Sequence, residues 1–365
     1  MSDPVLKLIE QLCAVEPDRR PGGQGNEDAV ALVADRLRGA GWGVSLPEFE
    51  VLNWVGGNAF FRADSESVPI VPSPYSMPVE ASGPVRVVGS TEALLAENLT
   101  GSILVVTGSL VSEPLTPKRF PFYGSEEHKK IIEKLEGDRP AAIVAVTGKY
   151  PALCGALDPF PWIEDGDFEI PAAAVRPADA ALLLRSENEI GHVSIDAHRI
   201  RSTARNIVAQ KGRSDRRLVV CAHIDSKPGT PGAVDNAAGV AALVVLAERL
   251  AQYDDLPVGI ELLAVNGEDH FAAPGEVAWL AANEESLDTI ELFINIDGAG
   301  YRRGRTAFSF YNVDAERVER SKRVFADLDD LIEGPPWYQS DHAIFAMQGR
   351  PAMAMTTESV SYTHL

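Results

Sequence analysis

Three short apolar runs in the second half of the chain each end directly in polar residues that can bind a metal. They are Leu218–Ala222 before His223, Val258–Val265 before Asn266–Asp269, and Leu292–Ile296 before Asp297. Apolar runs of this length, bounded by polar residues, are typical of buried strands. In an open α/β sheet, groups at the carboxyl ends of the strands gather in one crevice. The pattern therefore predicts an α/β fold with a metal-binding site at one edge of the sheet.

A helix is predicted directly after Asp235, because the spacing of the apolar residues changes there. The apolar positions that follow recur at helical intervals, namely Val240, Leu243, Val244, Ala247 and Leu250. The positive end of this helix would face the site, where it favours a carboxylate or an anionic intermediate rather than a cation. Asp235 is therefore expected to bind the metals as a negatively charged group.

The residue types fit a pair of divalent cations. Two ions about 3.5–4 Å apart need a bridging carboxylate, with further imidazole or carboxylate ligands on each ion. We predict that Asp235 is the bridge and that His223 and Asp297 complete the first site. Asp269 and His342, the latter from the sequence SDH, are predicted to hold the second ion.

Three further residues are candidates for catalytic roles. Glu268, next to a predicted ligand, could accept a proton from metal-bound water and pass it to a leaving amine. Asp225 could accept the second ring N–H of His223 and orient the ring, or it could form a turn over Asp225–Gly229. Tyr338 could stabilise a developing oxyanion, or it could be an aromatic residue at the rim of the cleft.

These motifs resemble the M28 zinc aminopeptidases, a family with two catalytic zinc ions. The resemblance covers most of the segment from Asn206 to Glu358, and NIVA at Asn206–Ala209 leads into the strand before His223 as in that family. It implies a mixed central sheet flanked by helices, two zinc ions, and hydrolysis of N-terminal peptide bonds by a hydroxide that bridges the metals. It also implies a strained, often cis, peptide between Asp235 and Asn236.

One position departs from the family pattern. The family usually has Glu-Glu where this chain has Glu268-Asp269, so the second ligand is one methylene shorter. Aspartate binds zinc, and the loop could move inward to compensate. The identity of the second metal is therefore an open question.

Several other functions stay open. A carboxypeptidase or dipeptidase could use the same scaffold, and a glutaminyl-cyclase-like acyltransferase would use similar ligands with one zinc ion. A non-catalytic peptidase-like binding protein is also conceivable, although every expected ligand position carries a competent residue. Metal stoichiometry and product mass would separate these alternatives.

The chain is long enough for two domains. We predict a discontinuous metallopeptidase domain over residues 1–56 and 203–365, with helices at 4–13 and 28–37 and a strand at 42–49. Residues 57–202 are predicted to form an inserted, β-rich domain. Its sequence IPAAAV, within Phe168–Val175, resembles a protease-associated lid, and it could shape access to the site or simply stabilise the fold.

The carboxyl end is expected to be truncated. Family members usually continue past the segment that matches Pro351–Glu358 into a loop with an HT-type motif and a closing helix. The sequence here ends with VSYTHL, which could be native or foreign.

Charge and composition limit the partners. There are 53 acidic and 33 basic residues, a formal charge of −20, which argues against nucleic acid and anionic membranes. An acidic surface could attract the cationic amino terminus of a peptide substrate, although solubility alone would account for it. The start of the chain lacks the pattern of a signal peptide, the chain has no long apolar window, and three cysteines indicate no disulfide framework. We therefore expect a cytoplasmic protein. The sequence does not indicate the oligomeric state.

Overall fold

The computed structural model describes residues 4–147, 161–213, 215–253, 255–302 and 304–358. The chain divides into two compact units, one of residues 1–51 and 203–365 and the other of residues 52–202. Strands β2 (Glu48–Ala63) and β9 (Ile190–Arg205) each contain one of the two points at which the units divide. Cys154 and the final VSYTHL lie outside the described residues.

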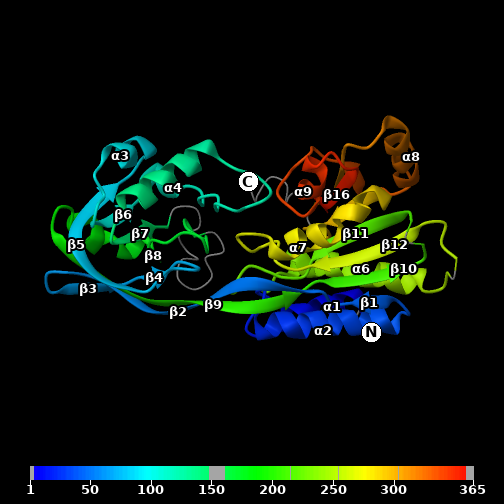
Figure 1. Ribbon diagram of the computed structural model, residues 1–365, viewed down its shortest axis with the longest axis horizontal. Coiled ribbons are helices and arrows are strands. Elements are labelled where there is room, and N and C mark those ends of the chain that lie inside the picture. The colour runs from blue at the N-terminus through cyan, green and yellow to red at the C-terminus, as the bar shows by residue number, and fades with distance from the viewer. Residues whose placement is uncertain (1–3, 148–160, 214, 254, 303, 359–365) are drawn as a thin grey trace. The chain divides into compact units, whose positions relative to one another are not determined.

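The first unit is built around a mixed eight-stranded sheet (Figure 1). Its order is β1 (Gly43–Ser45), β10 (Ile207–Lys211), β12 (Gly259–Val265), β11 (Arg217–His223), β13 (Ile290–Ile296), β16 (Ala352–Thr357), β14 (Thr306–Tyr311) and β15 (Leu331–Glu333). The four central strands, β12, β11, β13 and β16, are parallel, whereas β1, β10 and β14 pair antiparallel with their inner neighbours. The predicted mixed α/β sheet is therefore confirmed.

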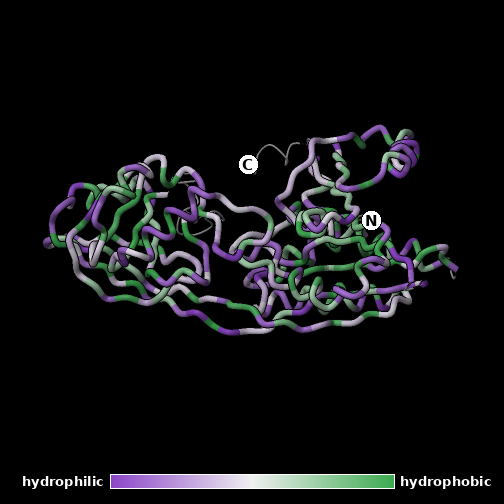
Figure 2. Tube along the Cα trace, turned by 45° about the horizontal axis from the view of Figure 1, so that its top comes forward, coloured by the Kyte–Doolittle hydropathy of each residue, from purple (hydrophilic) through white to green (hydrophobic). Residues whose placement is uncertain are grey.

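Helices cover both faces of this sheet because the central strands are apolar on both sides. Val220 and Ala222 of β11 pack in a core with α1 (Pro4–Cys13), α2 (Gln24–Gly39) and α6 (Ala238–Leu250). Val219 and Cys221, which alternate with them, pack on the other face with α7 (Pro274–Asn283) and α9 (His342–Met347). This alternation is the pattern of a strand buried between two layers of helices. Figure 2 shows the hydropathy along the chain, with green, hydrophobic stretches between purple, hydrophilic ones.

The predicted elements of this unit agree with the structure except at one strand. The helices expected at 4–13 and 28–37 are α1 and α2, and the helix expected after Asp235 is α6, which begins at Ala238. The strand expected at 42–49 is instead split. β1 ends at Ser45, and β2 starts at Glu48, after Pro47. Proline lacks the N–H that a continuous strand would need there. The short strand β15 forms the edge of this sheet opposite β1, and helix α8 (Ala315–Phe325) precedes it in the chain.

The second unit has its own eight-stranded sheet, in the order β3 (Glu66–Pro69), β2, β9, β5 (Val79–Val88), β6 (Ile103–Val106), β7 (Ala142–Val146), β8 (Ala172–Val175) and β4 (Val71–Pro72). Strands β5 to β8 are parallel. Helices α3 (Thr91–Ala96) and α4 (Glu126–Asp138) contribute Leu94, Ile131 and Leu135 to a core on one side of these strands, and the short helix α5 (Ala181–Arg185) contributes Leu183 to a second core. In the described part of the chain, no helix is both long and apolar enough to cross a membrane.

Candidate metal centre

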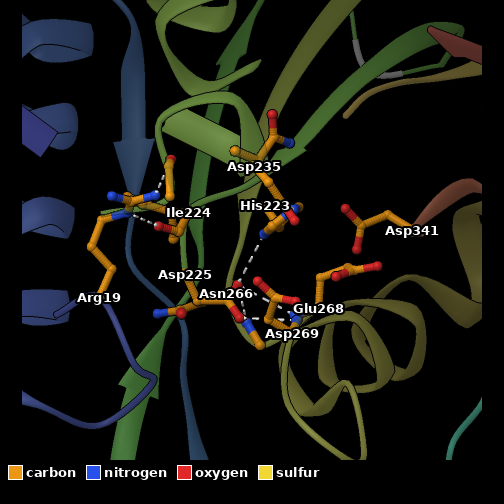
Figure 3. A network of polar contacts seen from close by, with 12 residues as sticks. Arg19, His223, Ile224, Asp225, Asp235, Asn266, Glu268, Asp269 and Asp341 are labelled. Carbon is orange, nitrogen blue, oxygen red and sulfur yellow. Dashed lines mark hydrogen bonds and ion pairs between the residues drawn. The ribbon is translucent and has the colours of Figure 1, made fainter. Parts of the chain in front are cut away.

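Three of the predicted metal ligands, His223, Asp235 and Asp297, meet at the carboxyl edge of the first sheet, and Figure 3 shows the first two of them. His223 is the last residue of β11 and is fully buried, whereas Asp297 directly follows β13. The Nε2 atom of His223 lies 3.0 Å from Asp235 Oδ1 and 3.4 Å from Asp297 Oδ1. His223, Asp235 and Asp297 each offer one ligand atom, and these three atoms all lie within 4.8 Å of one another. These residues can therefore share one cation.

The hydrogen bonding of His223 supports a cation at this position. Both ring nitrogens are buried, and among the described residues neither has a hydrogen-bond partner of good geometry. Buried polar atoms are rarely left without a partner unless an ion or a water satisfies them. Burial alone would lower the pKa of His223, but Asp297, Asp225 and Asp235 together hold it well above its usual value. Without a metal, the protonated ring would supply the positive charge that these carboxylates require.

Asp235 is held toward Asp297 by the residue that follows it. The peptide bond between Asp235 and Asn236 is cis, which confirms the expectation from the family resemblance. The side chain of Asn236 donates from Nδ2 to the carbonyl of Ile296 at 2.8 Å and accepts from the amide of Gly239 at 3.0 Å. Asn236 thereby joins the Asp235 turn both to the end of β13 and to the first turn of α6.

Asp297 is oriented by the polar residues around it. The hydroxyl of Ser340 donates to Asp297 Oδ2 at 2.7 Å and accepts from Asn295 Nδ2 at 2.8 Å. Because Oδ2 is engaged in this way, Oδ1 is the oxygen that faces His223. Ser340 of the SDH sequence thus acts on the site through a ligand.

Asp225 connects His223 to the loop after β12. Its carboxylate accepts the backbone N–H groups of Gly267 at 2.7 Å, Glu268 at 3.3 Å and Asp269 at 3.1 Å. Its Oδ1 lies 3.6 Å from His223 Nδ1. Burial raises the pKa of Asp225, but the adjacent histidine and these N–H groups hold the pKa below its usual value.

His223, Asp225 and Asp269 also form a group with donor atoms within 4.8 Å of one another. Within this group, only the Asp225 oxygens already accept backbone N–H groups. We interpret Asp225 as the residue that fixes the positions of both the imidazole ring and the loop.

Glu268 and Asp269 stand side by side on that loop, close to His223 (Figure 3). Burial raises the pKa of both carboxyls well above the usual value, and for Asp269 the largest further contribution comes from the charge of Asp235. The Oδ2 atom of Asp269 is buried and, within the described chain, has no hydrogen-bond partner. Carboxylates crowded in this way are destabilised unless a positive charge lies between them. Asp269 is therefore a candidate ligand for a second cation.

His342 is not brought to the cluster. The ring is buried at the start of α9, with Nε2 2.7 Å from the carbonyl oxygen of Trp337 and Nδ1 3.3 Å from Asn295 Nδ2. Since the carbonyl can only accept and the amide donates, the ring is neutral with its proton on Nε2. Burial lowers the pKa of His342 to about 4, which agrees with this form. Coordination by His342 would require it to give up one of these hydrogen bonds.

We expect the variant His342→Asn to keep the metal content of the wild-type protein. The change removes a ring that packs between Tyr311 and Trp337, each with its ring centroid at 4.8 Å, so stability should fall by about 2–4 kcal/mol. Atomic emission spectroscopy on the purified protein and a thermal melt would measure both effects. Loss of one metal ion from a variant that remains folded would instead identify His342 as a ligand.

Two buried acids near the cluster were not anticipated from the sequence. Asp341 is fully buried close to Glu268 (Figure 3), and burial, together with the charge of Asp297, raises its pKa to about 7 despite the opposing effect of His223. Glu276 of α7 is also buried, and its pKa is raised by burial and by Asp341. The sequence offered a signal only for Asp341, which lies within SDH.

Tyr338 is 47% exposed and makes an edge-on contact with the Tyr311 ring, with the ring centroids 5.1 Å apart. None of the contacts described for it reaches the cluster, so its role as an oxyanion donor stays a prediction.

The fold and the cluster together define the first unit as an α/β unit of the metallopeptidase type. Residues 206–364 match the model of peptidase family M28. A probable lipoprotein aminopeptidase, LpqL of Mycobacterium tuberculosis, is 26% identical over 301 residues. That match covers 80% of this chain, which spans only 57% of the length of the mycobacterial relative.

Solved structures share the fold. A zinc aminopeptidase from Bacillus subtilis superimposes with a TM-score of 0.73 at 18% identity, covering 97% of this chain and 84% of that one. An aminopeptidase from Aneurinibacillus sp. strain AM-1 gives a TM-score of 0.69 at 17% identity with the same coverage. At these identities the likeness shows that the architecture is common to the three proteins.

Proposed function

We propose that the protein is a zinc-dependent aminopeptidase that hydrolyses N-terminal peptide bonds. The observation that carries the proposal is the meeting of His223, Asp235 and Asp297 at the strand ends, with the His223 nitrogens buried and without hydrogen bonds among the described residues. The match of residues 206–364 to a peptidase family supports it. The mycobacterial relative is named a probable aminopeptidase and the Bacillus subtilis protein a zinc aminopeptidase, which supports the direction of cleavage and the metal.

Two zinc ions are proposed, with Asp235 between them. His223 and Asp297 would complete the first site, and Asp269 would bind the second ion. Because Asp269 replaces a longer glutamate, its loop must bring the carboxylate close, and the backbone bonds to Asp225 hold that loop inward. The donors are one imidazole and several carboxylates, a combination that suits zinc.

Different residues of this chain would then have different roles in peptide hydrolysis. When bound, the metal ions would acidify a water molecule and polarise the scissile carbonyl. Glu268 would take a proton and transfer it to the leaving amine, since it lies beside the ligands and is not needed as one. Asp225 and Ser340 would keep the ligands oriented, and Tyr338 would donate to the developing oxyanion.

A panel of substrates tests the direction of cleavage. We expect aminoacyl nitroanilides with a free amine to be hydrolysed and the same compounds with an acetylated amine to be inert. Cleavage of N-blocked peptides from the carboxyl end would contradict the proposal and indicate a carboxypeptidase. Release of a cyclised product from an N-terminal glutamine peptide, detected by mass, would indicate a glutaminyl-cyclase-like reaction.

We also propose a reducing compartment such as the cytoplasm. Cys13 and Cys221 are both free thiols, and burial raises the pKa of each. The mycobacterial relative is by name a lipoprotein, so fractionation of the native host is the test.

A further inference from the structure

Arg19 is a fully buried arginine close to the metal centre, and its contacts are unusual. Its guanidinium donates to the backbone carbonyls of Leu12 at 3.1 Å, Ile224 at 2.9 Å, Pro231 at 2.7 Å and Gly232 at 2.8 Å. Three of these four carbonyls belong to the connection that leads from β11 to Asp235. Figure 3 shows the side chain reaching toward Ile224 beside the cluster. Arg19 therefore bonds to both ends of this connection.

The burial of this charge has an electrostatic consequence. Arginine is rarely fully buried without a compensating charge, and the acceptors named above are neutral. Burial lowers the pKa of Arg19, whereas Cys13 and then the carboxylates of Asp225, Asp269 and Asp235 raise it. These acidic groups thus help to hold the cation in place, and the cation in turn reduces the repulsion among the carboxylates.

The chain passes close to Arg19 at a glycine. Gly232 has a φ of +56°, and a Cβ atom there would lie 2.5 Å from Arg19 Nη2 and 2.6 Å from the carbonyl oxygen of Asp235. Only glycine allows the guanidinium and the Asp235 turn to approach this closely. Asp18 adds a contact to the same connection, since its Oδ2 accepts the amide of Gly229 at 3.0 Å.

A neighbouring residue holds the second ligand loop. Asn26, in the first turn of α2, exchanges two hydrogen bonds with Asn266, at 2.9 Å and 2.8 Å, and also bonds to the carbonyl of Arg19 at 2.8 Å. Asn266 opens the loop that carries Glu268 and Asp269. The short segment Asp18–Asn26 thus contacts both loops that bear ligands.

We infer that Arg19 is a positioning residue for the metal centre. Its hydrogen bonds to the carbonyls of Ile224, Pro231 and Gly232, which we name the Arg19 clamp, fix Asp235 against His223 and so set the affinity for metal. The inference rests on the proposed function only in requiring that these residues bind metal. Arg19 itself lies outside residues 206–364, which carry the family match, whereas the connection that it holds lies inside them. A planar guanidinium can donate hydrogen bonds to several carbonyls at once, whereas the ammonium group of a lysine cannot match that geometry.

The test is the zinc affinity of the full-length variant Arg19→Lys, measured by competition with a chelator at fixed pH, together with the zinc content and a thermal melt. We expect a folded protein whose zinc Kd is at least about tenfold weaker, with kcat lowered more than KM is raised. The matched control is Arg36→Lys on α2, which alters an arginine paired with Glu248 at the surface and should leave the Kd unchanged.

A second variant changes the residue that Arg19 contacts instead of Arg19 itself. Gly232→Ala leaves Arg19 intact but forces it away from the loop, so the same weakening of zinc binding is expected. Wild-type affinity in folded Arg19→Lys and Gly232→Ala would overturn the clamp while leaving the proposed function in place. Failure of both variants to fold would show that Arg19 serves the fold alone. A wild-type protein that binds no zinc would overturn the proposed function and the clamp together.

Discussion

Substitution of Glu268 by glutamine is expected to lower kcat by a factor of about 10²–10⁴ while zinc stays bound, because the amide cannot accept and transfer a proton. The side chain keeps its size, and the loop keeps its backbone bonds to Asp225, so the ligands should not move. Steady-state kinetics on a free-amine substrate, together with metal analysis of the same sample, would measure the two effects.

The control for this variant is Glu285→Gln, an exposed residue in the turn before β13 that should retain full activity. Turnover near the wild-type level in Glu268→Gln would remove Glu268 from the role of base. Loss of zinc from that variant would instead make Glu268 a ligand.

Replacement of His223 by asparagine is expected to abolish both metal binding at the first site and activity. His223 is the only imidazole in either group of metal-competent residues found among the described residues. Removal of a zinc ligand also leaves Asp235 and Asp297 with like charges and no cation between them. We expect the zinc Kd of that site to rise by at least about a thousandfold, which isothermal titration with zinc would show.

The matched control is His198→Asn in the second unit, a surface histidine whose side chain is 67% exposed beside Asp196. It should bind zinc as the wild-type protein does. Normal zinc content in folded His223→Asn would contradict the site itself, and with it the proposed peptidase function.

Much of the sheet could be predicted from the sequence because its central strands are short, continuous apolar runs. β11, β12 and β13 end at His223, Val265 and Ile296, next to the residues that the pattern had singled out. The strand ends therefore brought His223 and Asp297 together as expected. Asp235 could be placed because a change of apolar spacing marked the helix that follows it.

The surroundings of the site could not be predicted in the same way. Arg19 and Asn26 lie in a polar, glycine-rich stretch that is typical of a surface turn, yet both are buried and bond to residues more than 200 positions away. His342 shows that a pattern of residue types does not reveal the hydrogen-bond partners of a side chain. A histidine next to an aspartate is chemically competent as a ligand, but its two ring nitrogens are engaged by Trp337 and Asn295. Partners of this kind are set by tertiary packing.

The reciprocal amide pair of Asn26 and Asn266 has a consequence for the order in which the protein folds and binds metal. It joins positions 240 residues apart, so the chain must close a very long loop before the two can meet. Contacts of such separation form slowly compared with local helices and hairpins. On the ribosome, the loop with Glu268 and Asp269 emerges long after Asn26, and Asp297 later still. We therefore expect zinc to be captured at the end of folding, by a nearly complete protein, rather than to nucleate it.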